Sequence, residues 1–168
     1  MITIRREAPS DREAVRLIHE LAFGRQDEAE IVDALHESNV ALLSLVALYA
    51  DLPVGHIMFS QVRVGEESCI VEGMGLGPMA VLPEYQRKGI GSALVESGLN
   101  ILKDDSCPFV VVLGHPKYYP RFGFEPASNR GIKSQWKGIP NDVFMIRVLD
   151  EDRMKDVHGV ARYRDEFS

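Results

Sequence analysis

The sequence predicts a mixed α/β fold in a single domain, and three observations support this. The chain has 168 residues, a length that suits one domain and allows a sizeable hydrophobic core. Helical and strand-like patterns alternate along it, and it contains no internal repeat or Pro/Ser-rich linker. Over residues 75–113 a strand-like stretch, a glycine-rich turn, an amphipathic helix and a second strand-like stretch follow one another, which predicts a βαβ unit.

A short strand and two helices are expected at the start of the chain. Residues 2–5 form the predicted strand. Ser10 and Glu13 have the spacing of a capping box, in which each side chain can satisfy a free backbone amide of the first turn. Asp27 and Glu30 repeat this signal, so a second helix is expected to begin there.

Strands dominate the rest of the chain. The link Asp51-Leu52-Pro53 is turn-like and favours a hairpin between its flanking strands. Phe109–Leu113 is continuously apolar, as expected of a strand covered on both faces. The expected strands are 41–50, 54–64, 69–82, 109–113, 143–149 and 157–163, with a helix over 89–102.

Composition excludes several classes of partner. The hydrophobic share of 45% and the charged share of 26% are ordinary for a folded domain. The net charge of −6 argues against a general nucleic-acid binder, because phosphate neutralisation needs a basic surface. No stretch approaches the ~18 apolar residues of a membrane span, and the N-terminus lacks a secretory pattern. We therefore expect a cytoplasmic protein without membrane or nucleic-acid partners.

The charge is distributed unevenly. Residues 1–39 hold nine acidic residues and five arginines, whereas residues 115–138 hold five basic residues and one acid. The basic segment is either a solvated loop or a binding site for a small polyanion. The acidic segment would suit a cationic partner.

Cysteine and histidine give little sign of reactive or metal chemistry. Cys69 and Cys107 have no neighbouring histidine in sequence, so both are interpreted as buried structural thiols. The five histidines lack metal-ligand spacing, and no metal is expected. His115 suits turn structure, and Trp136 either lines a pocket or caps the core.

The most informative segment runs from Leu76 to Leu94. A strand ends before Pro83, and Gly89 and Gly91 open the next helix. The unpaired N–H groups of a first helical turn carry a partial charge of about +0.5 and receive phosphate well. The short Gly-x-Gly pattern alone is weak, and a tight turn without a ligand is the alternative. It matches neither a Walker loop nor the three-glycine dinucleotide fingerprint.

In context, this segment resembles the acyl-CoA signature of the GNAT superfamily of N-acyltransferases, Gln/Arg-x-x-Gly-x-Gly/Ala, with Gln86, Gly89 and Gly91 at the signature positions. Tyr118-Tyr119-Pro-Arg-Phe-Gly-Phe124 is similar to the family's second pattern, aromatic-Tyr-x-x-apolar-Gly-Phe. The order of elements agrees over nearly the whole chain, most closely with a bacterial subgroup of predicted acetyltransferases. The resemblance implies one acyl-CoA N-acyltransferase domain over residues 1–168, with a mostly antiparallel central sheet, a splayed strand pair and flanking helices.

The resemblance also implies a cofactor and its site. Acetyl-CoA would be the co-substrate, with its pantetheine arm on the strand backbone and its pyrophosphate on the helix amides. The implied cofactor-binding residues are Met79, Ala80, Val81, Gln86, Arg87, Lys88, Gly89, Ile90, Gly91 and Ser92.

The implied reaction is direct attack of a primary amine on the thioester in a ternary complex. A backbone N–H near Val81 could stabilise the oxyanion. Tyr119 is the implied acid, because a phenol with a pKa of about 10 can protonate a leaving thiolate; its alternative is a packed aromatic. Some members carry a glutamate where this chain has Gly75, so the base is open: Glu72, a water chain, or an amine that arrives neutral.

Other functions stay open from the sequence. One is a non-catalytic acyl-CoA-binding sensor or interaction module, and another is a binder of a different nucleotide phosphate. The acceptor would be a small-molecule or peptide amine, and the acidic helices would suit a polyamine, an aminoglycoside or a lysine side chain. The late strands are compatible with a homodimer.

Overall fold

The computed structural model describes residues 1–38, 40, 42–66 and 68–168. Ala41, at the start of one predicted strand, lies outside these residues. The chain forms two compact units. Unit 1 comprises residues 1–59, 77–98 and Phe167, and unit 2 comprises residues 60–76, 99–166 and Ser168. Two strands and one helix run through both units.

Unit 1 is built on antiparallel strands. In spatial order these are β1 (Ile2–Arg6), β2 (Leu43–Tyr49), the first part of β3 (Leu52–Val64) and the end of β4 (Val71–Val81). Ala50 and Asp51 both have positive φ angles and connect β2 to β3, as in a type I′ hairpin turn. The predicted hairpin is confirmed, but its turn lies one residue earlier than expected, and Leu52 and Pro53 belong to β3.

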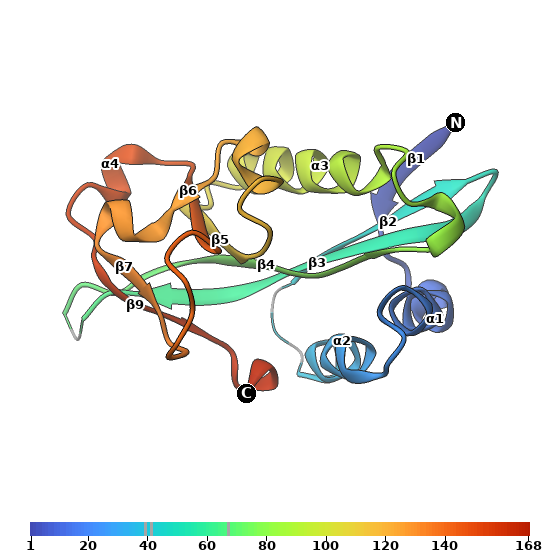
Figure 1. Ribbon diagram of the computed structural model, residues 1–168, viewed down its shortest axis with the longest axis horizontal. Helices are drawn as coiled ribbons and strands as arrows, with labels where there is room; N and C mark the ends of the chain where they lie inside the picture. Colours follow the sequence, from blue (N-terminus) through green and yellow to red (C-terminus); the bar gives the residue numbers. More distant parts are fainter. Residues whose placement is uncertain (39, 41, 67) are drawn as a thin grey trace. The chain divides into compact units, whose positions relative to one another are not determined.

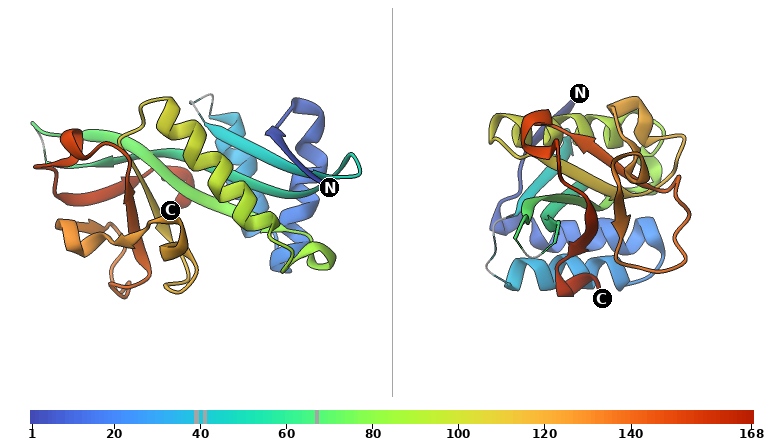
Figure 2. Two further views of the ribbon diagram at one scale, coloured as in Figure 1. Left: turned by 90° about the horizontal axis from the view of Figure 1, so that it is seen from above. Right: turned by 90° about the vertical axis from the view of Figure 1, so that its left-hand side faces the viewer.

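Helices cover both faces of the strands of unit 1 (Figures 1 and 2). On one face lie α1 (Arg12–Phe23) and α2 (Asp27–Glu37), and on the other lies the first part of α3 (Ile90–Asp104). Successive side chains of β3 point alternately toward the two helical layers, because side chains alternate between the two faces of a strand. Met58 packs in a cluster with Val15 of α1 and Leu35 of α2, whereas the fully buried Phe59 lies against α3 at Gly98.

Gly98 permits this close packing, since a Cβ atom there would lie 2.3 Å from the Phe59 ring. We expect Gly98→Ala to lower the free energy of unfolding. Overpacking costs about 1–3 kcal/mol, which a gain in helix propensity of about 1 kcal/mol offsets only in part. Urea unfolding measures the change, with Ser97→Ala on the same helix as the control. A Gly98→Ala protein as stable as the control would contradict this packing.

The start of α1 differs from the prediction. The residue before α1 is Asp11, and it makes no side-chain hydrogen bond to the helix, so the predicted capping box of Ser10 and Glu13 is wrong. Its carboxylate accepts instead from the Ala8 N–H at 2.7 Å, ahead of the 3₁₀ helix Pro9–Asp11, and pairs with Arg5 at 2.6 Å. The helix α2, in contrast, begins at the predicted Asp27.

A polar cluster lies inside unit 1. The fully buried His56 places its Nδ1 atom 2.8 Å from Nε2 of His19 and its Nε2 atom 2.7 Å from the hydroxyl of Ser44. The carboxylate of Glu7 lies 3.2 Å from His56 and 3.0 Å from His36, and it also accepts from Ser44. Four elements or their flanks therefore contribute ionisable groups to this hydrogen-bonded cluster, and β2 contributes the Ser44 hydroxyl.

Unit 2 combines the remaining strands with one short helix. The elements are β5 (Phe109–Leu113), β6 (Glu125–Pro126), β7 (Ile132–Ser134), β8 (Phe144–Val148), α4 (Glu151–Met154) and β9 (Gly159–Tyr163). The strand β4 pairs in parallel with β5, which completes the predicted βαβ unit. Antiparallel pairs join β5 to β8, β8 to β6 and β9 to β3, while β7 and β9 are parallel. The sheet is thus mixed and mostly antiparallel, as predicted.

Short 3₁₀ helices complete the fold. They span Pro9–Asp11, Pro83–Tyr85, Tyr119–Phe122, Ala127–Arg130 and Asp165–Phe167.

The pairing of β4 with β5 is short. Its register covers Met74–Leu76 of β4 and Val110–Val112 of β5. At the next position Gly77 has a φ of 138°, and Pro78 has no N–H to give to a ladder. The segment Met79–Val81, where the pantetheine arm is predicted to bind, lies beyond this register.

Candidate active site

The end of β4, the loop of residues 82–89 and the start of α3 lie in unit 1 and together contain every predicted cofactor-binding residue. The Leu82 N–H donates to the Val54 carbonyl at 2.8 Å, which ties the end of β4 to β3. The side-chain amide of Gln86 donates to the Val81 carbonyl at 2.9 Å. The glutamine of the signature therefore shapes the loop by holding the strand end against the turn.

Three exposed residues, Arg87, Lys88 and Gly89, directly precede α3. The first helical hydrogen bond runs from the Ala93 N–H to the Gly89 carbonyl at 3.0 Å, so the preceding amides come before the helical ladder. The first turn has no acidic residue, which leaves the positive end of the helix dipole unopposed there. Gly89 has a φ of 82°, and a Cβ atom there would meet no heavy atom within 4 Å. An anion can therefore approach these amides.

Two positive charges accompany the amides. Arg87 and Lys88 are exposed, and neither forms an ion pair within the described part of the chain. The ammonium of Lys88 lies 5.7 Å from the centre of the Tyr85 ring. Beside the loop is a cavity of about 560 Å³, lined by Ile2, Tyr49, Glu84, Tyr85, Lys88 and Ile90. The charge, the open amides and the space fit a phosphate-bearing ligand.

Tyr119 lies in unit 2, at the start of a 3₁₀ helix that ends at Phe122. Its side chain is buried, and its ring packs edge-on against Tyr118 and Phe124, with centroid distances of 5.0 and 5.7 Å. A Cβ atom at Gly114 would lie 2.2 Å from this ring, so the glycine after β5 makes room for it. Burial raises the pKa of Tyr119 to about 12. The phenol is therefore a proton or hydrogen-bond donor near neutral pH.

The Gly-Phe end of the tyrosine motif has a structural role. Gly123 adopts the left-handed conformation with a φ of 86°. The guanidinium of Arg147 donates to the Phe122 carbonyl, and a Cβ atom at Gly123 would lie 2.7 Å from this guanidinium. The glycine therefore lets an arginine from β8 hold the turn that carries Tyr119.

The predicted base candidate lies on β4 in unit 2. Glu72 is half exposed and pairs with Arg63 at 3.1 Å. A Cβ atom at Gly75, three residues on, would lie 2.7 Å from the ring of Tyr163 and 2.8 Å from Val62. Tyr163 of β9 thus fills the space that a side chain at position 75 would need. Sequence reasoning noted the missing glutamate but missed this packing cause.

The two cysteines differ in exposure. Cys69 is exposed, so the prediction that both thiols are buried is wrong for this residue, which precedes β4. The thiol of Cys107 is partly buried and donates to the Phe109 carbonyl at 3.2 Å, and burial raises its pKa.

His115 and Trp136 take structural positions. The Nδ1 atom of His115 accepts from the Lys117 N–H at 3.1 Å, which agrees with the predicted turn role. The ring of Trp136 is half-buried and packs on Tyr163 with a centroid distance of 4.9 Å.

Ion pairs neutralise part of the charge in both charged segments noted in the sequence. In the basic segment, Arg130 pairs with Glu125 and Glu151. In the acidic segment, Arg16 pairs with Glu20 and Asp33, and other carboxylates pair with Arg5 and Arg25. In neither segment, therefore, are all the charged side chains unpaired.

Two further properties concern metals and membranes. Among the residues that the structure describes, no group of three or more His, Cys, Asp or Glu side chains could hold a metal ion. In the same part of the chain, no helix combines the length and apolar character needed to span a bilayer.

The fold and the loop define a protein of the acyltransferase class, and comparisons with known proteins agree. The sequence profile of the acetyltransferase (GNAT) domain matches residues 3–127. The N-acetyltransferase YjhQ of Escherichia coli K12 is 41% identical over 136 residues, covering 79% of this chain and 75% of YjhQ. The chain belongs to the GNAT acetyltransferase family.

Two solved structures are similar over almost the whole chain. One is the GNAT family N-acetyltransferase YhbS from Escherichia coli in complex with CoA, with a TM-score of 0.90, 32% identity, and coverage of 99% of this chain and 91% of that chain. The other is a GNAT family acetyltransferase from Brucella melitensis in complex with acetyl-CoA, with a TM-score of 0.80, 34% identity, and coverage of 100% and 99%.

Proposed function

We propose that this protein transfers the acetyl group of acetyl-CoA to a primary amine by direct attack in a ternary complex. The β4–α3 loop carries the proposal: its amides are open to an anion, its first helical turn lacks acids, and two free basic side chains flank it. The complexes of YhbS with CoA and of the Brucella acetyltransferase with acetyl-CoA support this choice of ligand. Met79–Val81 would bind the pantetheine arm, and the backbone amides of residues 87–92 the pyrophosphate.

The protein's own groups have distinct roles in this proposal. Acetyl-CoA supplies the activated acyl group. Tyr119 donates its phenolic proton toward the departing sulfur as the C–S bond breaks and the C–N bond forms. A backbone N–H near Val81 stabilises the oxyanion. Glu72, or water, accepts the proton that the amine loses.

Acetyl-CoA should stabilise the folded protein, because it binds only the native state. Occupancy at about 100 times Kd contributes about 2.7 kcal/mol, which corresponds to a rise in Tm of about 5–10 °C for a chain of this size. Differential scanning fluorimetry measures the shift. Gly89→Asp should abolish it by placing a carboxylate among the open amides.

Gly138→Asp is the matched control, since Gly138 has a φ of 78° and a Cβ atom there would likewise meet no heavy atom within 4 Å. It should keep the full shift. No shift with millimolar acetyl-CoA, or a larger one with ATP or NAD, would overturn the cofactor assignment.

A second candidate function is a non-catalytic acyl-CoA-binding module. It is favoured by one observation: position 75 holds no carboxylate, and the nearest one on β4, Glu72, is paired with Arg63. Release of free thiol from acetyl-CoA over a panel of amines separates the two. Binding without any turnover would favour the module.

A further inference from the structure

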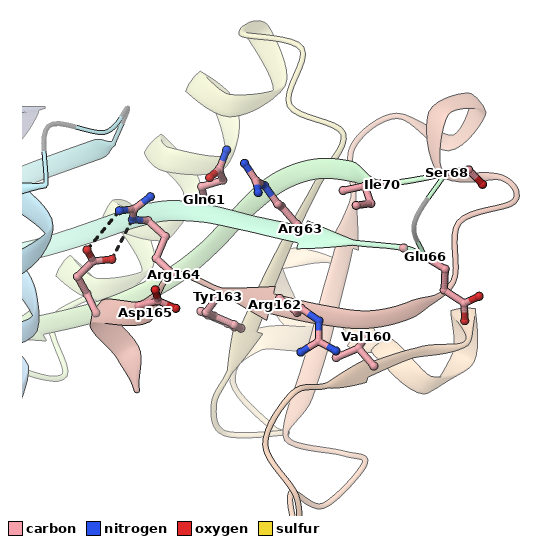
Figure 3. A pocket seen from close by; sticks show the side chains of 12 residues that line it. Gln61, Arg63, Glu66, Ser68, Ile70, Val160, Arg162, Tyr163, Arg164 and Asp165 are labelled. Atoms are coloured by element: carbon pink, nitrogen blue, oxygen red, sulfur yellow. Dashed lines mark hydrogen bonds and ion pairs between the residues drawn. The ribbon is translucent and has the colours of Figure 1, made fainter.

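A groove in unit 2 is not used by the steps described above. Its volume is about 960 Å³, and it lies over β3 and β9 beside the connection from β3 to β4 (Figure 3). A volume of this order is typical of sites for small organic ligands. All the residues that line the groove belong to unit 2, and none of them is a predicted cofactor-binding or catalytic residue. The groove is therefore a separate feature of unit 2.

The register of two strands places positive charges next to one another. Arg63 of β3 lies directly opposite Arg162 of β9 in the antiparallel pair, and both line the groove. Arg164 also lines it and follows Arg162 by two positions along extended backbone, so these two side chains share a face. Like charges at directly opposite positions destabilise a sheet unless anionic groups offset them.

The protein offsets two of these three charges itself. Arg63 pairs with Glu72 at 3.1 Å, and Arg164 pairs with Glu166 at 2.9 Å. Arg162 is exposed and has no ion pair or side-chain hydrogen bond within the part of the chain that the structure describes. Arg162 therefore offers a free guanidinium to a ligand in the groove.

Two carboxylates in the groove are also unpaired. Glu66 and Asp165 line it, and neither forms an ion pair with another residue that the structure describes. In Figure 3 they lie toward opposite ends of the row of labelled side chains, with Arg162 between them. A ligand that carries only negative charge meets Arg162 but is repelled by both carboxylates. A ligand that carries both signs can satisfy both kinds of group.

Apolar side chains lie among these charges. Val160 precedes Arg162 by two positions in β9, so it lies on the same face of the strand, and Ile70 lines the groove just before β4. Ile70 is 52% exposed. A carbon chain that covers these two side chains removes apolar surface from water, which is favourable. The groove therefore suits an aliphatic ligand with charged ends.

We propose that this groove binds a small aliphatic zwitterion, with its carboxylate on Arg162 and its ammonium group on Glu66 or Asp165. A guanidinium binds a carboxylate through two parallel hydrogen bonds, and the bound carboxylate offsets the repulsion between Arg63 and Arg162. The carbon chain between the two ends contacts the apolar side chains. No part in acetyl transfer is assigned to this ligand.

Ligands of matched carbon chain test the charge requirement. The zwitterions 4-aminobutanoate, 5-aminopentanoate and 6-aminohexanoate are each compared with the fatty acid anion and the alkylamine of the same length. Chemical-shift titration of the isotope-labelled full chain gives each Kd and shows which residues respond. We expect the best zwitterion to bind about 5-fold more tightly than either analogue, as for one exposed ion pair of good geometry. The shifts should centre on β9 and on the connection from β3 to β4.

Substitutions assign the two charged ends. Arg162→Gln should reduce the affinity for the zwitterion to that for the alkylamine. One of the two variants Glu66→Gln and Asp165→Asn should reduce it to that for the fatty acid anion. Arg12→Gln removes the same charge from an exposed position on α1 in unit 1 and should leave every Kd unchanged. All four side chains are exposed, so the variants should keep the wild-type fold.

Each outcome decides for or against the zwitterion site. Binding that is lost in Arg162→Gln and kept in Arg12→Gln supports it. Equal binding of the zwitterion and either analogue, or Arg162-dependent binding of inorganic phosphate tighter than that of every zwitterion, overturns it. Zwitterion binding that survives Arg162→Gln, or the absence of saturable shifts at tens of millimolar, also overturns it. Because no turnover is measured, these results do not depend on whether the protein acetylates an amine.

Discussion

We expect Tyr119→Phe to lower kcat by about 100-fold or more, since a positioned acid contributes roughly 10²–10⁴-fold to a rate. Stabilisation by acetyl-CoA should not change, because the loop amides that would bind the pyrophosphate belong to other residues. The substitution keeps the ring that packs against Tyr118 and Phe124 and removes only the hydroxyl. Thiol release with a saturating amine measures the loss.

Tyr118→Phe provides the matched control, since it removes a hydroxyl from the adjacent residue. It should retain most of the activity. If both variants turn over at the wild-type rate, Tyr119 is a packed aromatic and the leaving thiolate takes its proton from solvent.

The raised pKa of Tyr119 defines how it acts. A phenol with a pKa of about 12 is about 3.5 units weaker as an acid than an ordinary thiol, so complete proton transfer to a thiolate is uphill by about 5 kcal/mol. In the proposed reaction Tyr119 would therefore act mainly as a hydrogen-bond donor to the developing charge. Its titration should not limit the rate at any pH below about 10.

The second large effect is a loss of stability at acidic pH. We expect the free energy of unfolding to fall by about 2 kcal/mol or more between pH 7 and pH 5. Burial lowers the pKa of His19 from 6.5 to about 3, and burial also lowers the pKa of His56. Below pH 6.5 the unfolded chain binds protons that the folded chain does not, so stability falls as pH falls.

Glu7 extends this loss to lower pH. Although burial raises the pKa of Glu7, the hydrogen bonds from His36, His56 and Ser44 together hold it well below its ordinary value. A carboxyl with a lowered pKa stabilises the fold above about pH 4.5 and loses that contribution as pH falls further. Stability should therefore drop in two stages, first through the histidines and then through Glu7.

Urea unfolding at a series of pH values measures this slope. His19→Gln removes the titrating ring and should flatten the decline between pH 7 and pH 5, even where its stability at pH 7 is lower. His158→Gln replaces an exposed histidine and should reproduce the wild-type slope. Equal slopes in all three proteins would contradict the role of the cluster.

The local parts of this molecule were predictable from sequence. The loop from Val81 to Ile90 depends on neighbouring residues: a strand end, a glutamine that reaches back five positions, and glycines at a helix start. The residues that shape this loop are therefore all present in its own sequence pattern. The strand Phe109–Leu113 was likewise predicted to the residue, because a five-residue apolar run between Pro108 and Gly114 suits a buried strand, although its last residue, Leu113, is exposed.

Features that depend on distant segments were not predictable. Glu7, His19, His36 and His56 show no spacing that indicates a cluster, since separate elements bring them together. The capping box was assigned to the wrong residues because a 3₁₀ helix, Pro9–Asp11, precedes α1, and Asp11 rather than Glu13 accepts from a backbone amide and pairs with Arg5. The opposition of Arg63 and Arg162 follows from strand register, which propensity does not determine.

The packing of Tyr163 against Gly75 affects how sequences of this family are compared. Because the ring occupies the volume that a side chain at position 75 would need, the two positions must vary together. A glutamate at the first requires a smaller residue, or a displaced strand, at the second. We therefore expect a glycine paired with a tyrosine at these positions to mark members that lack a carboxylate at the first position, and an alignment tests this without a structure.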